Sequence, residues 1–441
     1  MQHLSSALPF IAPVRVAAVS FAVLALLLVV APIVVDVSFS VASVVMLLAC
    51  IVGLFAGLAL AAPGRPPPAT STSIPHRGWN RLARRIIGIG AVGVVLIAFD
   101  RYLLRGLDLG FDLFEARVAL EETESGPLSL VAALLSSFVP FGPIAAWLAA
   151  ATGRPLPRLL QALSWSVLGV YLMMSVALGS RSLVLVCALL YLFAFGWFRG
   201  LRGERIRARH VVGVLLAGVG LVGLLAGLLL RRLELMGLSA IDSIQLSVYA
   251  YTLKPSPELL GFLEANEYLG AAGAAAYSVL VYVLHGSLEF LVRFDEFRGP
   301  RTDGALTLWL PLKFLSYLLP LPEVPDLDTL DGVRTGVFTT FAGPALLDAG
   351  IAAPALLMVK FFFLALPFRL LARGDLRWLF AALQVAVIIA LSPMIDLLDS
   401  ATGAYPLVAA LLIGLMAPRQ FRKSGATPVP RRTPFESRNV S

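Results

Sequence analysis

Runs of about 20 apolar residues recur along the chain and constrain its fold more than any other feature. An α-helix of that length spans the hydrocarbon core of a bilayer, because it satisfies its own backbone hydrogen bonds. Of the 441 residues, 59% are hydrophobic and 14% are charged, against roughly 25% charged in soluble domains. We therefore predict an all-α, polytopic integral membrane protein with about 10–12 transmembrane helices. The ten apolar runs lie at 16–35, 39–62, 86–99, 128–151, 159–178, 182–198, 211–230, 345–371, 376–397 and 401–416.

Positive charge is distributed unevenly among the connections between these runs. Arginines concentrate in the connection before 86–99 and in the segment RGLRGERIRAR at 199–209. Cytoplasmic loops retain Lys and Arg, so the alternation of runs predicts that both termini are cytoplasmic. We expect four regions, with the helix numbers approximate: an N-terminal bundle of about seven helices at 1–230, an external region at 231–344, about three helices at 345–418, and a basic cytoplasmic tail at 419–441.

The external region contains two apolar stretches, 269–293 and 306–321, whose placement the sequence leaves open. They fit interfacial helices, re-entrant helices or an additional pair of spans. Irregular backbone at membrane depth has to be buried in protein or line a water-filled cavity. We therefore expect these stretches to line a lateral cavity at the external face.

The first of these stretches carries a stripe of polar residues. Tyr277, His285, Glu289 and Arg293 are separated by multiples of four residues, so an α-helix places them on one face. Ionisable side chains at membrane depth are costly and by default indicate a functional site. The alternative is an amphipathic helix that lies on the membrane surface with its polar side in water.

His285 and Glu289 stand four residues apart, which permits a direct hydrogen bond and an acid/base role for the imidazole near neutral pH. A purely structural polar pair fits the spacing equally well. Three aspartates at span ends, Asp348, Asp396 and Asp399, are interpreted as structural or capping residues. No cluster of histidines or cysteines suggests a metal site. The chain has no P-loop and no dinucleotide-binding fingerprint, so we expect no cofactor and no nucleic-acid partner.

Arginines near span ends also gather at the predicted external face, where the anionic inner leaflet cannot account for them. The guanidinium fork suits a phosphate or pyrophosphate headgroup. The alternatives are pairing with nearby carboxylates such as Asp100 and Asp108, or snorkelling to the interface. The residues concerned are Arg101, Arg105, Arg117, Arg181, Arg231, Arg232, Arg293 and Arg301.

Three stretches resemble the bacterial oligosaccharide repeat-unit polymerases, the Wzy-type O-antigen and exopolysaccharide polymerases. They are Leu178–Arg181 (LGSR), Tyr282–Phe290 (YVLHGSLEF) and Phe338–Gly350 (FTTFAGPALLDAG). The pattern of about ten spans with a long external region before the last three is also similar to that family. In the third stretch, the family pattern of Asp-Phe-Gly is replaced by Asp348-Ala349-Gly350.

This resemblance implies a metal-independent, GT-C-like glycosyltransferase of the bacterial inner membrane. The donor would be a glycan on undecaprenyl pyrophosphate, and flippase and chain-length regulator proteins would be partners. Arginines at the external face would stabilise the pyrophosphate leaving group. Under this hypothesis Arg117, Arg181, Arg231 and Arg232 bind pyrophosphate, and Arg293 positions substrate or pairs with Glu289. His285, assisted by Glu289, would activate or orient the acceptor hydroxyl.

Two other functions fit parts of the same pattern. An O-antigen ligase would share the arginines and differ in its acceptor. A transporter or flippase for an anionic lipid-linked sugar would carry polar groups through the depth of several spans, whereas most spans here lack charges in their middles. The sequence therefore favours chemistry at one membrane face.

Overall fold

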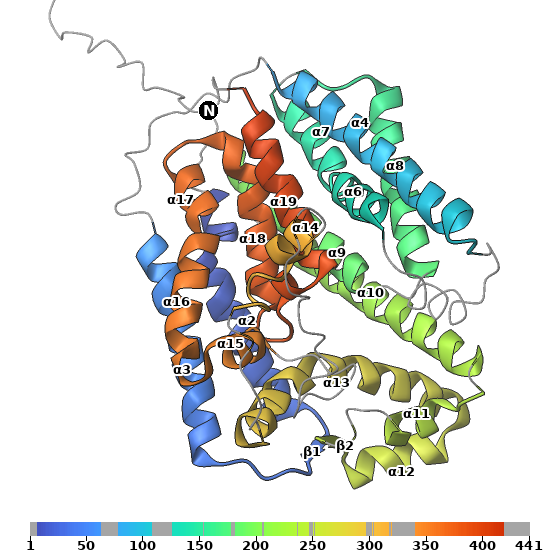
Figure 1. The fold of residues 1–441 in the computed structure, drawn as a ribbon. Helices are drawn as coiled ribbons and strands as arrows, with labels where there is room; N and C mark the ends of the chain where they lie inside the picture. Colours follow the sequence, from blue (N-terminus) through green and yellow to red (C-terminus); the bar gives the residue numbers. More distant parts are fainter. Residues whose placement is uncertain are drawn as a thin grey trace, which may run out of the picture.

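The computed structural model shows a bundle of helices with a single two-stranded sheet among the described residues (Figure 1). It confirms the predicted all-α fold class. The structure describes residues 7–62, 78–107, 126–152, 154–177, 181–204, 207–235, 237–246, 250, 252–296, 302, 304–316, 319 and 340–418. The predicted tail at 419–441 lies outside this part of the chain.

The N-terminal half is built from long apolar helices. The short 3₁₀ turn η1 precedes α2, and the π-helical turn η2 continues α4. The elements are η1 (Leu8–Phe10), α2 (Pro13–Val30), α3 (Val41–Ala61), α4 (Trp79–Ala98), η2 (Phe99–Leu104), α6 (Pro127–Ser136), α7 (Phe141–Ala151), α8 (Arg158–Ala177), α9 (Arg181–Leu201) and α10 (Ala208–Leu235).

The second half begins with short helices around one long one, α13, and closes with an apolar group that returns to the bundle. The elements are α11 (Ala240–Leu246), α12 (Pro257–Ala265), α13 (Glu267–Glu296), α14 (Trp309–Ser316), α15 (Ala342–Ala349), η5 (Gly350–Ala352), α16 (Ala353–Leu364), α17 (Leu366–Ala372), η6 (Leu376–Trp378), α18 (Leu379–Leu391), η7 (Leu397–Asp399) and α19 (Ala401–Met416).

Eight helices in the described part of the chain are long and apolar enough to cross a membrane. Six belong to the N-terminal half, one runs from Leu269 to Glu296, and one runs from Ala342 to Ala372. The last two predicted spans are shorter apolar helices, Leu376–Leu391 and Ala401–Met416. The chain is therefore a multi-pass membrane protein.

The predicted end of the first span was wrong. The first apolar run continues to Val35, but α2 ends at Val30, and Ile33–Val35 forms strand β1. Pro32 accounts for the difference, because proline disfavours the helical conformation of the residue before it. Strand β1 pairs antiparallel with β2 (Leu253–Pro255), in the register Val34 opposite Lys254. This sheet ties the end of the first helix to the chain that precedes α12.

The connections fall into two groups at opposite ends of the bundle (Figure 1). We call one the α17 end: there η1 packs against α9, because Phe10 contacts Gly196, and η6 packs against α19 at Gly414. We call the other the α13 end. It holds the β1–β2 sheet, α13, α15 and the turn at 392–400, and Ser40 before α3 donates from its backbone N–H to Asp295 of α13 at 2.6 Å.

Close backbone contact between α3 and α16 holds one side of the bundle, where the two helices lie side by side (Figure 1). A Cβ added at Gly53 would lie 2.3 Å from the carbonyl oxygen of Pro354, and one at Gly57 would lie 2.3 Å from that of Met358. Small residues allow this approach, as is usual at helix interfaces in membranes.

We expect Gly57→Val to force α3 and α16 apart and to lower the free energy of unfolding by at least about 1–3 kcal/mol, the usual cost of overpacking. Gly220→Val on α10 is the matched control, because a Cβ at Gly220 meets no atom within 4 Å. Thermal unfolding in detergent compares the two variants. Equal melting temperatures would contradict the importance of this contact.

Candidate functional site

The polar stripe on α13 faces the interior of the protein. Tyr277, His285, Glu289 and Arg293 expose only 5%, 1%, 1% and 6% of their surface. Helix α13 runs crosswise at the α13 end, and it packs against α2, α3, α10 and α15 (Figure 1). The interpretation of an amphipathic helix with its polar side in water is therefore wrong for this stretch, because the protein covers that side.

The buried stripe contains one ion pair and one imidazole close to it along the helix. Nε of Arg293 donates to Oε1 of Glu289 at 3.3 Å. Of the two roles predicted for Arg293, the pairing with Glu289 is confirmed. Nδ1 of His285 lies 3.2 Å from the carbonyl oxygen of Val281. The His285 ring also packs near the ring of Tyr282, with 5.7 Å between centroids.

A turn from the C-terminal group of helices packs against α13 beside His285. A Cβ added at Gly286 would lie 2.5 Å from the carbonyl oxygen of Met394, so only glycine allows the backbone of the turn to come this close. The hydroxyl of the next residue, Ser287, donates to the carbonyl oxygen of Pro393 at 3.4 Å. These contacts bring the turn at 392–400, with its aspartates, next to the predicted site.

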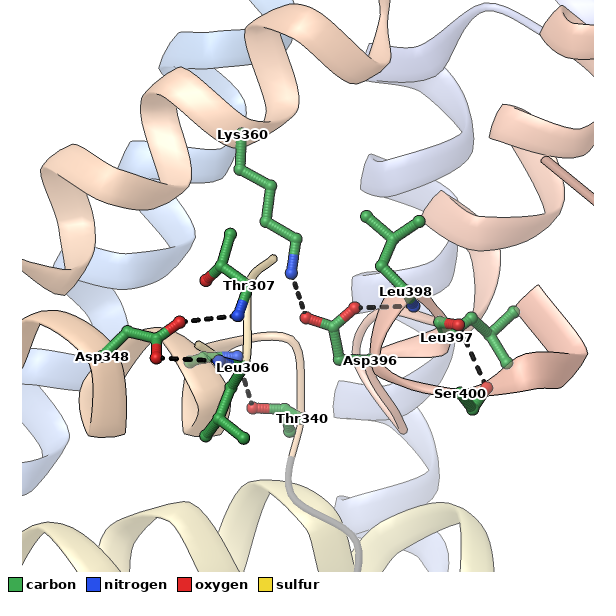
Figure 2. Close-up of polar contacts among 10 residues, drawn as sticks. Leu306, Thr307, Thr340, Asp348, Lys360, Asp396, Leu397, Leu398 and Ser400 are labelled. Atoms are coloured by element: carbon green, nitrogen blue, oxygen red, sulfur yellow. Dashed lines mark hydrogen bonds and ion pairs between the residues drawn. The ribbon is translucent and has the colours of Figure 1, made fainter. Parts of the chain in front are cut away.

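The turn carries one side of a buried ion pair. Figure 2 shows Lys360 reaching from α16 toward Asp396, and Nζ of the lysine donates to the carboxylate. The two side chains expose only 6% and 5% of their surface. Asp396 also accepts the backbone N–H of Leu398 at 3.0 Å and so caps η7. The ion pair therefore connects the middle of one apolar helix to the turn beside α13.

Asp348 of α15 holds the segment that leads into α14. Its carboxylate accepts the Thr302 hydroxyl at 2.5 Å. It also accepts the backbone N–H groups of Leu306 at 3.1 Å and Thr307 at 2.7 Å (Figure 2). Three donors satisfy this buried charge. Of the structural or capping roles predicted for these aspartates, Asp396 therefore caps η7, and Asp348 has a structural role.

The predicted pyrophosphate arginines lie on several different elements. Arg181 begins α9, and Arg231 and Arg232 stand near the end of α10. Their side chains and the whole of Arg117 lie outside the described part of the structure. Arg105 is paired locally: Nε lies 3.2 Å from the Asp100 carboxylate, and the guanidinium also donates to Ser129. For Arg105 the alternative of local pairing is therefore confirmed.

Lys360 is the residue of this region that the sequence analysis missed. It lies inside the apolar run ALLMVKFFFLAL at 355–366 and is one of only four lysines in the chain. A lysine surrounded by apolar residues in a span indicates a buried partner. That signal was available in the sequence, whereas the identity of the partner, Asp396, was not.

Comparisons of the chain with models of protein families, with curated proteins and with solved structures found no match.

Proposed function

We propose that this protein is a membrane glycosyltransferase that polymerises oligosaccharide repeat units carried on undecaprenyl pyrophosphate. The observation that carries the proposal is the buried Tyr277, His285, Glu289 and Arg293 stripe on α13, packed beside a second buried polar group at one end of the bundle. Ionisable groups at such a depth are retained for function in most membrane proteins. We take the type of reaction from the resemblance of this stretch to the repeat-unit polymerases.

In the proposed topology the α17 end faces the cytoplasm and the α13 end faces outward from the bacterial inner membrane. Both termini are cytoplasmic in this arrangement. Its support is the basic residues of the connections grouped at the α17 end, among them Arg199, Arg373 and Arg377. The site then lies on the side where lipid-linked repeat units are presented after translocation by a flippase, and a chain-length regulator acts on the product there.

The proposed reaction transfers the growing glycan to a hydroxyl of the next repeat unit. The hydroxyl oxygen forms a bond to the anomeric carbon, while the bond from that carbon to the pyrophosphate oxygen breaks. Undecaprenyl pyrophosphate departs with the bonding electrons. His285 accepts the hydroxyl proton, and the Glu289–Arg293 pair fixes the charge beside it. Arg117, Arg181, Arg231 and Arg232 stabilise the negative charge of the leaving group.

The purified full-length protein in lipid vesicles should convert lipid-linked repeat units into long glycan chains. We expect Arg181→Ala to lower the rate at least about 10²-fold, because a pyrophosphate oxyanion loses a charged donor. Arg209→Ala is the control: this exposed arginine stands at the cytoplasmic start of α10 in the proposed topology. Equal rates for the two variants would refute the pyrophosphate site, and no polymer from the wild type would refute the function.

One observation favours a transporter of an anionic lipid-linked sugar as the second candidate. The Lys360–Asp396 pair places charge inside a span, where the sequence analysis expected mostly apolar residues. Buried ion pairs of this kind occur along substrate pathways. Vesicles loaded with fluorescent lipid-linked repeat units separate the two functions, because a flippase changes the leaflet of the label without lengthening the glycan.

A further inference from the structure

Four ionisable side chains meet at the α13 end outside the proposed catalytic stripe. Asp348, Asp396 and Asp399 contribute three carboxyl groups, and Lys360 contributes one ammonium. Two of the carboxylates have hydrogen-bond donors. Asp348 accepts three hydrogen bonds, and Asp396 accepts Lys360 and a backbone N–H (Figure 2). The third, Asp399, differs from both.

Both carboxylate oxygens of Asp399 are inaccessible to solvent, and none of the residues that the structure describes donates a hydrogen bond to either of them. An ionised carboxylate without a donor in such a place costs several kcal/mol or more, whereas a neutral carboxylic acid avoids most of that cost. The geometry of Asp399 is therefore that of a group that holds its own proton.

The charges around Asp399 lead to the same conclusion. Asp396 stands on the same turn, Lys360 faces it from α16 and Asp348 from α15. Of the other elements against η7, α14 carries Lys313, α19 carries the buried Tyr405, and α18 carries no ionisable side chain. Burial, followed by the negative charge of Asp396, raises the pKa of Asp399 well above 3.8, while the Lys360 ammonium opposes the rise.

We propose that Asp399 carries a proton in the folded protein and that, with the Lys360–Asp396 pair, it forms a proton-binding site at the α13 end. Release breaks the Asp399 O–H bond and transfers the proton to water. The Lys360 ammonium, which already lies near the carboxylates of Asp396 and Asp348, then balances part of the new charge. The site does not depend on the proposed glycan transfer.

Proton binding at Asp399 sets the direction in which stability changes with pH. The folded protein keeps this proton above the ordinary pKa of 3.8, and the unfolded chain does not. The contribution is fully present below 3.8 and is lost as pH rises toward the raised folded value. The melting temperature of Asp399→Asn relative to that of the wild type should therefore rise as pH rises above 3.8.

Infrared difference spectroscopy of the full-length protein in lipid nanodiscs detects the proton directly. At about pH 5, above the ordinary pKa of an aspartate, the wild type should show the carbonyl band of a buried, protonated carboxylic acid. Asp399→Asn should abolish that band, and Asp242→Asn, at an exposed aspartate, should leave it unchanged. A wild type without the band, or a band that survives in Asp399→Asn, overturns the proposal.

A second variant covers the case in which Asp399→Asn does not fold. Asp399→Glu keeps a carboxyl group in protein labelled with isotopic aspartate. The isotope-shifted band should disappear and an unshifted carboxylic acid band should replace it. Persistence of the shifted band would assign the proton to another aspartate and overturn the site. None of these readouts requires glycan synthesis, so they distinguish failure of this site from failure of the proposed function.

Discussion

Replacing Lys360 with methionine should lower the free energy of unfolding by about 3–5 kcal/mol, the usual cost of leaving one partner of a buried ion pair alone. Methionine keeps most of the volume of the side chain, so the loss comes from the charge. Asp396 would remain buried, with the Leu398 N–H as its one remaining donor among the residues that the structure describes. Chemical unfolding in detergent, followed by tryptophan fluorescence, measures the change.

The chain offers a matched control for this substitution. Lys254 pairs with Asp36 beside the β1–β2 sheet, and both side chains are about half exposed, at 54% and 51%. Lys254→Met should therefore cost no more than about 1 kcal/mol, as expected for a surface pair. Adding Asp396→Asn to Lys360→Met removes the stranded charge and should restore much of the stability. Similar costs for the two single variants would show that the Lys360 pair is not buried in the membrane protein.

Replacing His285 with alanine should reduce the rate of repeat-unit polymerisation by about 10²–10⁴-fold, the usual contribution of a general acid/base. Glu289→Gln should cause a smaller loss, because the amide still accepts a hydrogen bond from Arg293 but no longer carries the negative charge. The assay is glycan synthesis by purified variants in lipid vesicles, with the initial rate as the measured quantity.

Ser278→Ala is the control on the same helix. Its hydroxyl donates to the Ala274 carbonyl oxygen one turn earlier, at 2.9 Å. The variant should keep the wild-type rate. Melting temperatures identify any variant that has lost its fold, which matters because Glu289 is buried against Arg293. Near-normal synthesis by folded His285→Ala and Glu289→Gln would exclude the acid/base assignment.

The long apolar helices could be predicted well from the sequence, because a segment that crosses a bilayer has to form all of its backbone hydrogen bonds internally. The sequence also predicted that Tyr277, His285, Glu289 and Arg293 share one face of a helix, since that follows from periodicity alone. Which way the face points could not be predicted. Helix α13 packs against α2, α3 and α15, which come from distant parts of the chain.

The association of the buried charged residues at the α13 end was harder still to predict. Asp348 and Asp396 were interpreted separately, as structural or capping residues, and Lys360 was overlooked. Their association depends on α15, α16 and the turn at 392–400 folding together, with Gly286 admitting the turn against α13. A single sequence records none of these pairings, because each contact joins residues that are far apart or lie on opposite sides of a helix break.

The contacts of α13 also have a consequence for biosynthesis. Gly286 meets Met394, and Asp295 binds Ser40 across 255 residues of chain. A chain emerging from the ribosome presents the stripe long before its last covering segment exists, since synthesis is vectorial. The charged residues of α13 must therefore wait in a partly assembled membrane intermediate. High contact order of this kind slows folding, and it makes completion of the C-terminal helices the step that closes the site.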